Sequence, residues 1–132
     1  MTVQYLVDTD WAIHWLNRHP GIVRRLGELQ PEGVAVSIIS LAELYEGVYH
    51  SMNPEGNERV LNEFLRGVAV LGVDQAICKV FGQERGRLRA TKRMIDDFDL
   101  LIAATSLQHD LTLLTNNRRH FDMVEGLRLE SI

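Results

Sequence analysis

The chain has 132 residues, 45% of them hydrophobic and 24% charged, a composition that excludes long disordered stretches and fits one folded domain. Its formal net charge of −4 excludes a general attraction to nucleic acid, so a polyanionic substrate would need a local basic patch or metal ions. There is no basic leader and no apolar run of the ~20 residues that a membrane span needs, so we expect a cytoplasmic protein without membrane segments.

The only cysteine, Cys78, has no partner for an internal disulfide. It lies between the apolar residues Ile77 and Val80, so we expect a small buried side chain, as suits a reducing compartment.

In chain order, short β-branched runs alternate with segments whose apolar residues recur at helical spacing. They predict a strand at 2–7, helices at 11–18 and 22–29, a strand at 33–40, helices at 41–49 and 60–65, a strand at 68–73, helices at 74–91 and 98–109, and strands at 112–115 and 127–131. Continuous apolar strands that are each followed by a helix are typical of a parallel sheet covered on both faces. We therefore expect an α/β fold with a central parallel sheet of four to five strands.

Polar side chains mark the places where these strands end or the next helices begin. Asp8 closes the first strand, Glu43 follows the second, Asp99 opens the most apolar helix, and Asn117 follows the fourth strand. Ligand sites of such sheets lie beyond the carboxyl ends of the strands, so we expect these residues to meet there. Clustered carboxylates repel one another unless a cation compensates, and oxygen ligands favour Mg²⁺ or Mn²⁺ over Zn²⁺. The pattern predicts metal-assisted hydrolysis of a phosphodiester.

A structural role would also explain each acid taken singly. Asp8 would cap the first helix, and Asp96 or Asp97 would cap the apolar helix that follows. Glu43 would be a solvated acid that compensates a helix dipole, with Glu46, one turn further on, as an alternative ligand. Convergence of these acids at matching strand ends favours the metal site.

Four segments of the chain, in the order YLVDTD, SIISLAELYEGV, DFDLLIAATSL and LLTNNRRHF, resemble PIN-domain ribonucleases, and most closely the VapC-type toxins of bacterial toxin–antitoxin pairs. The resemblance spans nearly the whole chain, so we expect one PIN domain over residues 1–132. It implies a Mg²⁺- or Mn²⁺-dependent endoribonuclease that cleaves RNA, is neutralised by a VapB-like antitoxin and forms a homodimer.

Carried over by position, the resemblance assigns the family's metal-binding acids to Asp8, Glu43 and Asp99, and its last, less uniform position to Asn117. Many relatives have an aspartate at that last position, so the amide argues against a second tightly held metal. The family's small hydroxyl positions, which either hydrogen-bond ligands or cap strand ends and helix starts, fall on Thr9, Ser40 and Thr115.

Basic side chains beside these acids offer the phosphate contacts that an acidic protein needs. The candidates for binding RNA are Arg85, Arg87, Arg89, Lys92, Arg93 and Arg118. A solvated helix face or an antitoxin-binding surface is an equally good explanation for them. Trp11 and Trp15 have the spacing of core or dimer packing rather than of base stacking. We expect no histidine within the acidic cluster and assign no catalytic histidine.

Two other functions remain open. The segment LVDTD resembles the start of aspartyl-phosphate phosphatases, whose first aspartate is a nucleophile, but Trp11 stands where glycine or threonine is usual and no partner lysine is evident. The second alternative is a non-catalytic binding module whose acidic pocket holds an ion or docks an arginine of a partner.

Overall fold

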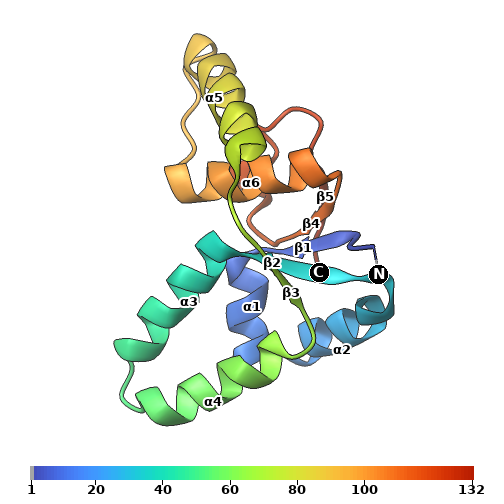
Figure 1. The fold of residues 1–132 in the computed structure, drawn as a ribbon, viewed down its shortest axis with the longest axis vertical. Coiled ribbons are helices and arrows are strands. Elements are labelled where there is room, and N and C mark those ends of the chain that lie inside the picture. Colours follow the sequence, from blue (N-terminus) through green and yellow to red (C-terminus); the bar gives the residue numbers. More distant parts are fainter. Residues whose placement is uncertain (1) are drawn as a thin grey trace.

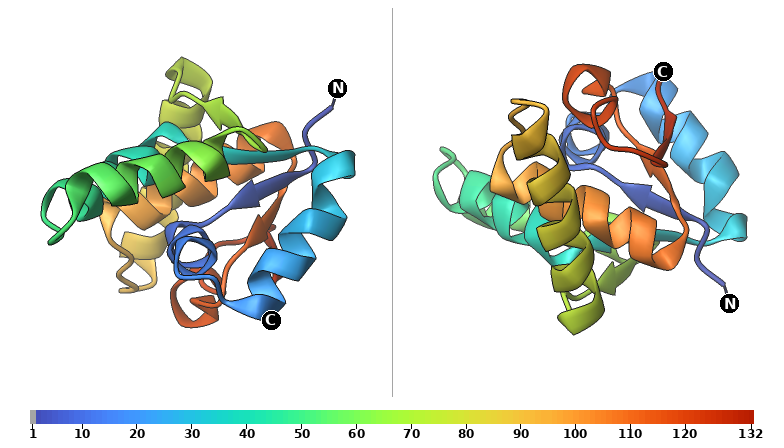
Figure 2. Two further views of the ribbon diagram at one scale, coloured as in Figure 1. Left: turned by 90° about the horizontal axis from the view of Figure 1, so that it is seen from below. Right: turned by 90° about the horizontal axis from the view of Figure 1, so that it is seen from above.

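The computed structural model describes residues 2–132 and contains one five-stranded sheet with helices on both sides (Figures 1 and 2). The strands are β1 (Tyr5–Val7), β2 (Val34–Ser37), β3 (Ala69–Leu71), β4 (Thr112–Leu114) and β5 (Arg128–Glu130). The helices are α1 (Thr9–Leu16), α2 (Pro20–Leu29), α3 (Ile38–Tyr49), α4 (Pro54–Leu65), α5 (Gln75–Ala90), α6 (Asp97–His109) and α7 (Arg118–Phe121), with a 3₁₀ turn η1 (Gln30–Glu32).

All five strands are parallel and lie in the order β3-β2-β1-β4-β5, which confirms the predicted α/β class. The central strand β1 pairs with β2 on one side and with β4 on the other. The carboxyl ends of these three strands therefore meet at one edge of the sheet, where the fold is expected to carry its site.

Successive residues of the strands alternate between two cores, as the two-residue period of a strand requires. On one face, Val7 and Leu114 pack against α1, α2, α3 and α4. On the other face, Leu6 and Leu113 pack with residues of α5 and α6. These two helices lie together on one side of the sheet (Figure 1). Because both faces are covered, the short strands can be almost wholly apolar.

The predicted tryptophan packing is confirmed. Trp11 is fully buried, and Trp15 packs with its ring centroid 5.3 Å from that of Phe64. The indole of Trp11 is not presented on the surface, and that of Trp15 is half-buried against the core.

Two local predictions were wrong. Cys78 is exposed rather than buried, because α5 turns Ile77 inward and Cys78 to the solvent side. β2 ends at Ser37, three residues earlier than predicted, so Ser37 rather than Ser40 caps α3: its Oγ accepts a hydrogen bond from the Ile39 amide at 3.0 Å.

No helix within residues 2–132 combines the length and the apolar character needed to cross a membrane.

Candidate active site

The sheet edge at the ends of β1, β2 and β4 gathers three of the predicted site residues. Asp8 follows β1 directly, Thr115 follows β4, and Glu43 lies in the second turn of α3, which begins where β2 ends. The amide of Asp8 donates to the Leu114 carbonyl at 2.9 Å, so the ends of β1 and β4 are joined at the site itself.

Asp8 is a buried acid with 4% of its surface exposed. It occupies the N-cap position of α1, yet among residues 2–132 its side chain accepts no capping hydrogen bond, so the interpretation of Asp8 as a helix cap was wrong. Its Oδ2 instead accepts a hydrogen bond from Thr115 Oγ1 at 2.7 Å. Burial raises the pKa of Asp8 to about 7, the charges of Asp10 and Asp99 push it the same way, and the Thr115 hydrogen bond opposes the rise.

Glu43 is held by the hydroxyl of Thr9, which is itself in contact with the hydroxyl of Ser40. Thr9 Oγ1, in the first turn of α1, donates to Glu43 Oε1 at 2.7 Å. A threonine hydroxyl has one proton, so the 2.9 Å contact between Thr9 Oγ1 and Ser40 Oγ uses the proton of Ser40. Burial raises the pKa of Glu43, and the charge of Asp99 adds to the rise. Glu43 and Asp99 therefore lie within electrostatic reach of each other.

The acidic run at the start of α6 divides its roles among its members. Asp96 caps the helix, since its Oδ1 accepts a hydrogen bond from the Asp99 amide at 2.8 Å. Asp97 forms an ion pair with Arg85 at 2.7 Å. Asp99 turns toward the site, and its side chain is 18% exposed. Burial raises the pKa of Asp99, as does the neighbouring Asp96, while a hydrogen bond from His120 lowers it.

The expectation that no histidine lies in the acidic cluster was wrong. His120 Nδ1 is 3.2 Å from Asp99 Oδ2 and 3.1 Å from the side-chain nitrogen of Asn117. Asn117 immediately precedes the four-residue helix α7, and its backbone amide donates to Thr115 Oγ1 at 3.0 Å. The predicted residue Asn117 is thus at the edge, with its side chain directed to His120.

Asp10 is a further acid of the site that the sequence did not single out. Its Oδ2 accepts a hydrogen bond from the Asn116 amide at 3.0 Å, and its charge contributes to the raised pKa of Asp8. The only signal in the sequence was its spacing, two residues after Asp8, and a first-turn acid of a helix has an ordinary dipole role.

The donor set at this edge suits a hard divalent cation in its chemistry. The side chains able to hold one are the carboxylates of Asp8, Asp10, Glu43 and Asp99, which offer only oxygen. Within residues 2–132, no three Asp, Glu, His or Cys side chains stand together as a ready-made metal site. The acids nevertheless lie close together. Burial is the main cause of the raised pKa of Asp8, and the charges of Asp10 and Asp99 add to it. The charge of Asp99 likewise adds to the effect of burial on the pKa of Glu43.

The predicted basic residues fall into two groups. Arg85 and Arg87 are committed to internal contacts: Arg85 donates to the Ile95 carbonyl at 2.9 Å, and Arg87 donates to the Met123 carbonyl at 2.6 Å. The other four are exposed at the end of α5, in the following loop and on α7, namely Arg89, Lys92, Arg93 and Arg118.

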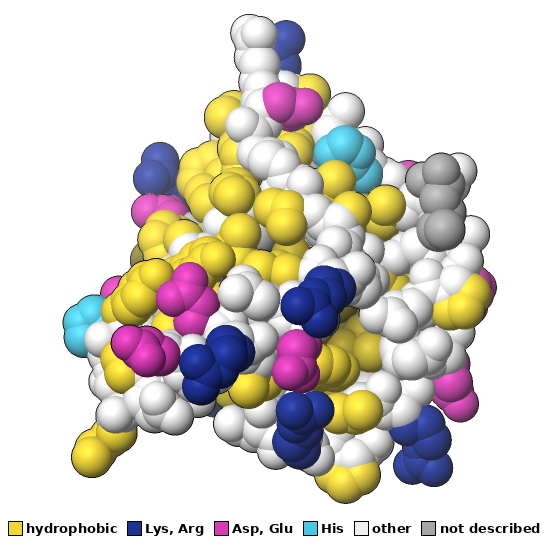
Figure 3. Space-filling model, turned by 60° about the horizontal axis from the view of Figure 1, so that its bottom comes forward, with side chains coloured by type: hydrophobic (Ala, Val, Ile, Leu, Met, Phe, Trp, Pro, Cys, Tyr) yellow, Lys and Arg dark blue, Asp and Glu magenta, His cyan; other side chains and the backbone are white. Residues whose placement is uncertain are grey.

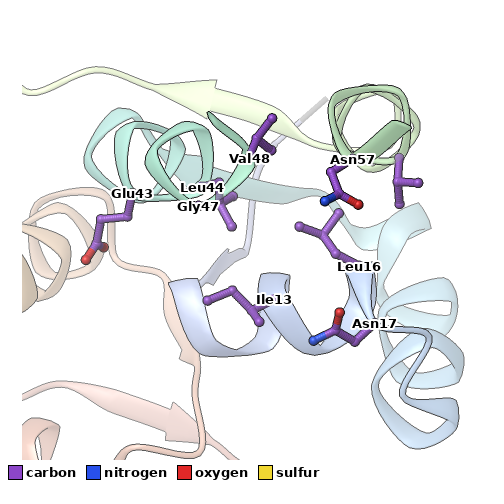
Figure 4. A pocket seen from close by; sticks show the side chains of 9 residues that line it. Ile13, Leu16, Asn17, Glu43, Leu44, Gly47, Val48 and Asn57 are labelled. Carbon is purple, nitrogen blue, oxygen red and sulfur yellow. The ribbon is translucent and has the colours of Figure 1, made fainter. Parts of the chain in front are cut away.

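An apolar groove leads away from Glu43 between α1, α3 and α4 (Figure 4). It encloses about 240 Å³ and is lined mainly by aliphatic side chains, with Glu43 at one end and Asn17 and Asn57 toward the other. Hydrophobic side chains also spread widely over the face that Figure 3 presents. A groove of this kind suits an apolar segment of a partner.

Comparison with known proteins shows the family of this chain. The PIN domain family matches residues 5–127. The chain is 33% identical over 128 residues to the tRNA(fMet)-specific endonuclease VapC of Shigella flexneri, covering 97% of each chain.

Solved structures give the same result. The structure of VapBC2 from Rickettsia felis, bound to a DNA fragment from its promoter, contains a chain with a TM-score of 0.93 and 30% identity, covering 98% of this chain and 99% of that one. The DNA-bound VapBC of Salmonella typhimurium gives a TM-score of 0.92 at 28% identity, with 98% of each chain covered. The chain belongs to the PIN-domain family and, within it, to the VapC group.

Proposed function

We propose that this protein is a toxin of the VapC type, an endoribonuclease that depends on a divalent metal, Mg²⁺ or Mn²⁺. The observation that carries the proposal is the buried Asp8, whose pKa burial and neighbouring acids raise to about 7, at the edge of the sheet where Asp99 and Glu43 also lie. An ion that replaced water around these carboxylates would stabilise their charged forms. The ribonuclease names of relatives that match the full chain support the substrate class.

Asp8, Glu43 and Asp99 are the proposed metal ligands. When bound, the ion would supply the acidity that generates hydroxide from water and would stabilise charge on the phosphate. Thr115 and Thr9 orient the carboxylates of Asp8 and Glu43 through hydrogen bonds of 2.7 Å each. These hydroxyls therefore act on the site through the acids that they hold.

The RNA backbone is proposed to contact the exposed basic residues rather than those committed to internal contacts. Arg89, Lys92 and Arg93 are exposed, whereas Arg85 is 11% exposed and paired with Asp97. Arg118 is also exposed, although it donates to Ser131 Oγ at 3.1 Å and lies 3.9 Å from Asp122 Oδ1. Because contacts between basic side chains and phosphates release counterions from RNA, we expect RNA binding that weakens steeply as salt is raised.

A VapB-like antitoxin is the proposed protein partner, since the VapBC complexes align with nearly the whole chain. We propose that an apolar segment of the antitoxin lies in the groove that ends at Glu43. The proposal includes a cytoplasmic homodimer, for which exposed apolar side chains such as Ile38, Val70 and Phe98 offer contact surface.

The proposed metal site is tested by titrating Mn²⁺ into partner-free protein by calorimetry and by assaying RNA cleavage with and without chelator. We expect Asp8→Asn and Glu43→Gln to lose both metal binding and cleavage. Glu46→Gln, one turn from Glu43 on the same helix and exposed, is the matched control and should retain both. If the wild type binds neither Mg²⁺ nor Mn²⁺ and Asp8→Asn still cleaves RNA, the proposed metal dependence is wrong.

The same assay separates the alternatives. Hydrolysis of a small phosphomonoester without RNA cleavage would favour the phosphatase. Metal binding without any hydrolysis would favour the non-catalytic module.

A further inference from the structure

One short segment, from Thr115 to His120, contacts three acids of the site, Asp8, Asp10 and Asp99. Thr115 Oγ1 donates to Asp8 Oδ2 at 2.7 Å and accepts from the Asn117 amide at 3.0 Å. The Asn117 side chain lies 3.1 Å from His120 Nδ1, which in turn lies 3.2 Å from Asp99 Oδ2. Asp8 and Asp99 are therefore linked through a continuous series of polar contacts.

His120 Nδ1 has either one proton to donate or one lone pair to accept with, so it cannot satisfy both neighbours in the same way. With a bare Nδ1, the nitrogen would accept from Asn117 and would face a carboxylate oxygen at 3.2 Å with no proton between them. With a proton on Nδ1, the ring donates to the carboxylate of Asp99 in a charge-assisted hydrogen bond.

The second arrangement also accommodates Asn117. The oxygen and nitrogen of a side-chain amide have nearly the same shape and exchange places when the amide turns over. Asn117 then presents Oδ1 to the same Nδ1 proton, and both neighbours accept from one donor.

The ring of His120 is well placed to hold Asp99 in one orientation. His120 precedes Phe121, which is fully buried and anchors α7 to the core. Of the two carboxylate oxygens of Asp99, His120 contacts only Oδ2. The other oxygen, Oδ1, has no hydrogen-bond partner within the described part of the chain. Oδ1 is thus available to an incoming ligand.

We propose that His120 is a positioning residue, whose Nδ1 proton holds Asp99 Oδ2 so that Oδ1 faces the metal, and that Asn117 orients the His120 ring instead of binding the metal itself. This inference rests on the function proposed above. It also gives a role to Asn117, which stands where many relatives have an aspartate. An amide can accept a hydrogen bond from the ring of His120 without adding a further negative charge.

Three variants of His120 test the inference through Mn²⁺ affinity. The amide nitrogen of His120→Asn occupies about the place of Nδ1, that of His120→Gln about the place of Nε2, and His120→Ala has neither. We expect His120→Ala and His120→Gln to weaken Mn²⁺ binding about 10- to 100-fold, the usual cost of losing an outer-shell partner. His120→Asn should retain most of the affinity. Equal affinities in all three variants would overturn the proposal.

A second measurement asks whether His120 acts through Asp99. In the Asp99→Asn background, His120→Ala should cause no further loss of Mn²⁺ affinity, because the group that it positions is already changed. An additional loss as large as in the wild type would show that His120 acts independently of Asp99.

The tautomer of His120 is measured without metal or RNA. In ¹⁵N NMR spectra at about pH 8, where a free imidazole is neutral, we expect the proton on Nδ1. A proton on Nε2 alone would overturn the proposal. If the wild type fails to bind Mn²⁺, the proposed function fails, whereas this spectrum still decides the role of His120.

Discussion

Asp8 is the residue at which function and stability conflict most clearly. A carboxylate with 4% exposure and one side-chain hydrogen-bond donor, Thr115, has lost most of its hydration. Burial of that kind disfavours the charged form. A protein selected only for stability would place an apolar or amide group here, so the acid itself indicates a site.

The metal-free protein should become less stable as the pH rises from about 4 to 7. The folded-state pKa of Asp8 is about 7 and its ordinary value is 3.8, so between these values the folded state binds more protons than the unfolded state. The free energy of unfolding therefore falls with rising pH in this window, and the contribution of a protonated Asp8 is lost above it. Urea unfolding in chelator at a series of pH values measures the fall. Asp8→Asn should reduce the slope, and a slope unchanged in that variant would exclude Asp8 as its source.

Two acids of the same helix turn should respond to mutation with opposite sign. In chelator, Asp99→Asn relieves the repulsion between Asp99 and its acidic neighbours, while the backbone N–H of residue 99 still donates to Asp96. The free energy of unfolding should therefore rise by roughly 0.5–2 kcal/mol. Asp96→Ala removes the cap and should lower it by about 0.5–2 kcal/mol. Thermal unfolding of both variants checks the signs. Destabilisation by Asp99→Asn would show that its carboxylate has a structural role.

The sequence predicted the acids of this site better than their surroundings. Asp8 and Glu43 follow β1 and β2, whose ends converge in a parallel sheet, and Asp99 lies close enough to raise the pKa of both. That these three acids bind a metal stays a prediction. Asp10 was missed because a first-turn acid looks like ordinary dipole compensation. His120 was missed because α7 has only four residues, too few to show any periodicity. Its contact with Asp99 depends on how α7 packs.

At the scale of elements, the connection from α5 to α6 determines where the acidic turn lies. Arg85, near the middle of α5, donates to the Ile95 carbonyl at 2.9 Å and to Asp97 Oδ1 at 2.7 Å. Ile95 is itself buried in the core between α5 and α6. Arg85 therefore holds the start of α6, and with it Asp99, against α5.

Arg85→Ala should destabilise the protein by about 1.5–3 kcal/mol, the range for hydrogen bonds to charged groups. Arg89→Ala, one helical turn further on α5 and exposed, should leave stability unchanged and weaken RNA binding. Chemical unfolding of both variants measures stability. RNA titration of the same variants combined with Asp8→Asn, which is expected to prevent cleavage, measures RNA binding. Equal stability of both variants would show that the contacts of Arg85 do not hold α6.

The predicted elements match the observed ones where the apolar pattern is long, as in α5 and α6. The predicted boundaries were wrong where the apolar pattern did not show at which residue a strand ends and the next helix begins. Both Ser37 and Ser40 are able to cap a helix, and only the pairing of β2, whose last residue Ser37 lies opposite Leu71, decides between them. Cys78 was misplaced because neighbouring apolar residues do not reveal which face of a helix is covered.

At the scale of the whole molecule, Glu43 belongs both to the acidic edge and to the apolar groove between α1, α3 and α4 (Figure 4). A partner that fills the groove must therefore reach the acids that are proposed to bind metal. Neutralisation of the toxin would then follow from occupancy of one continuous surface, without any change in the fold.

Gly47 provides a direct test of the groove. It lines the groove on α3, and a Cβ added there would meet no atom within 4 Å, so Gly47→Leu fills the groove without distorting the helix. Gly82 on α5 has the same open surroundings outside the groove, which makes Gly82→Leu the matched control. Both changes should stabilise their helices by up to about 1 kcal/mol, since leucine is the better helix former.

We expect Gly47→Leu protein to cleave RNA yet to resist inhibition by a VapB-like antitoxin, while Gly82→Leu protein is inhibited like the wild type. Cleavage measured against increasing antitoxin gives the inhibition constant of each variant, and size-exclusion chromatography shows whether the complex forms. If Gly47→Leu is inhibited as tightly as Gly82→Leu, the antitoxin binds elsewhere. The groove would then have to be explained by packing of a second copy of the chain, which the molar mass of the partner-free protein in solution reports.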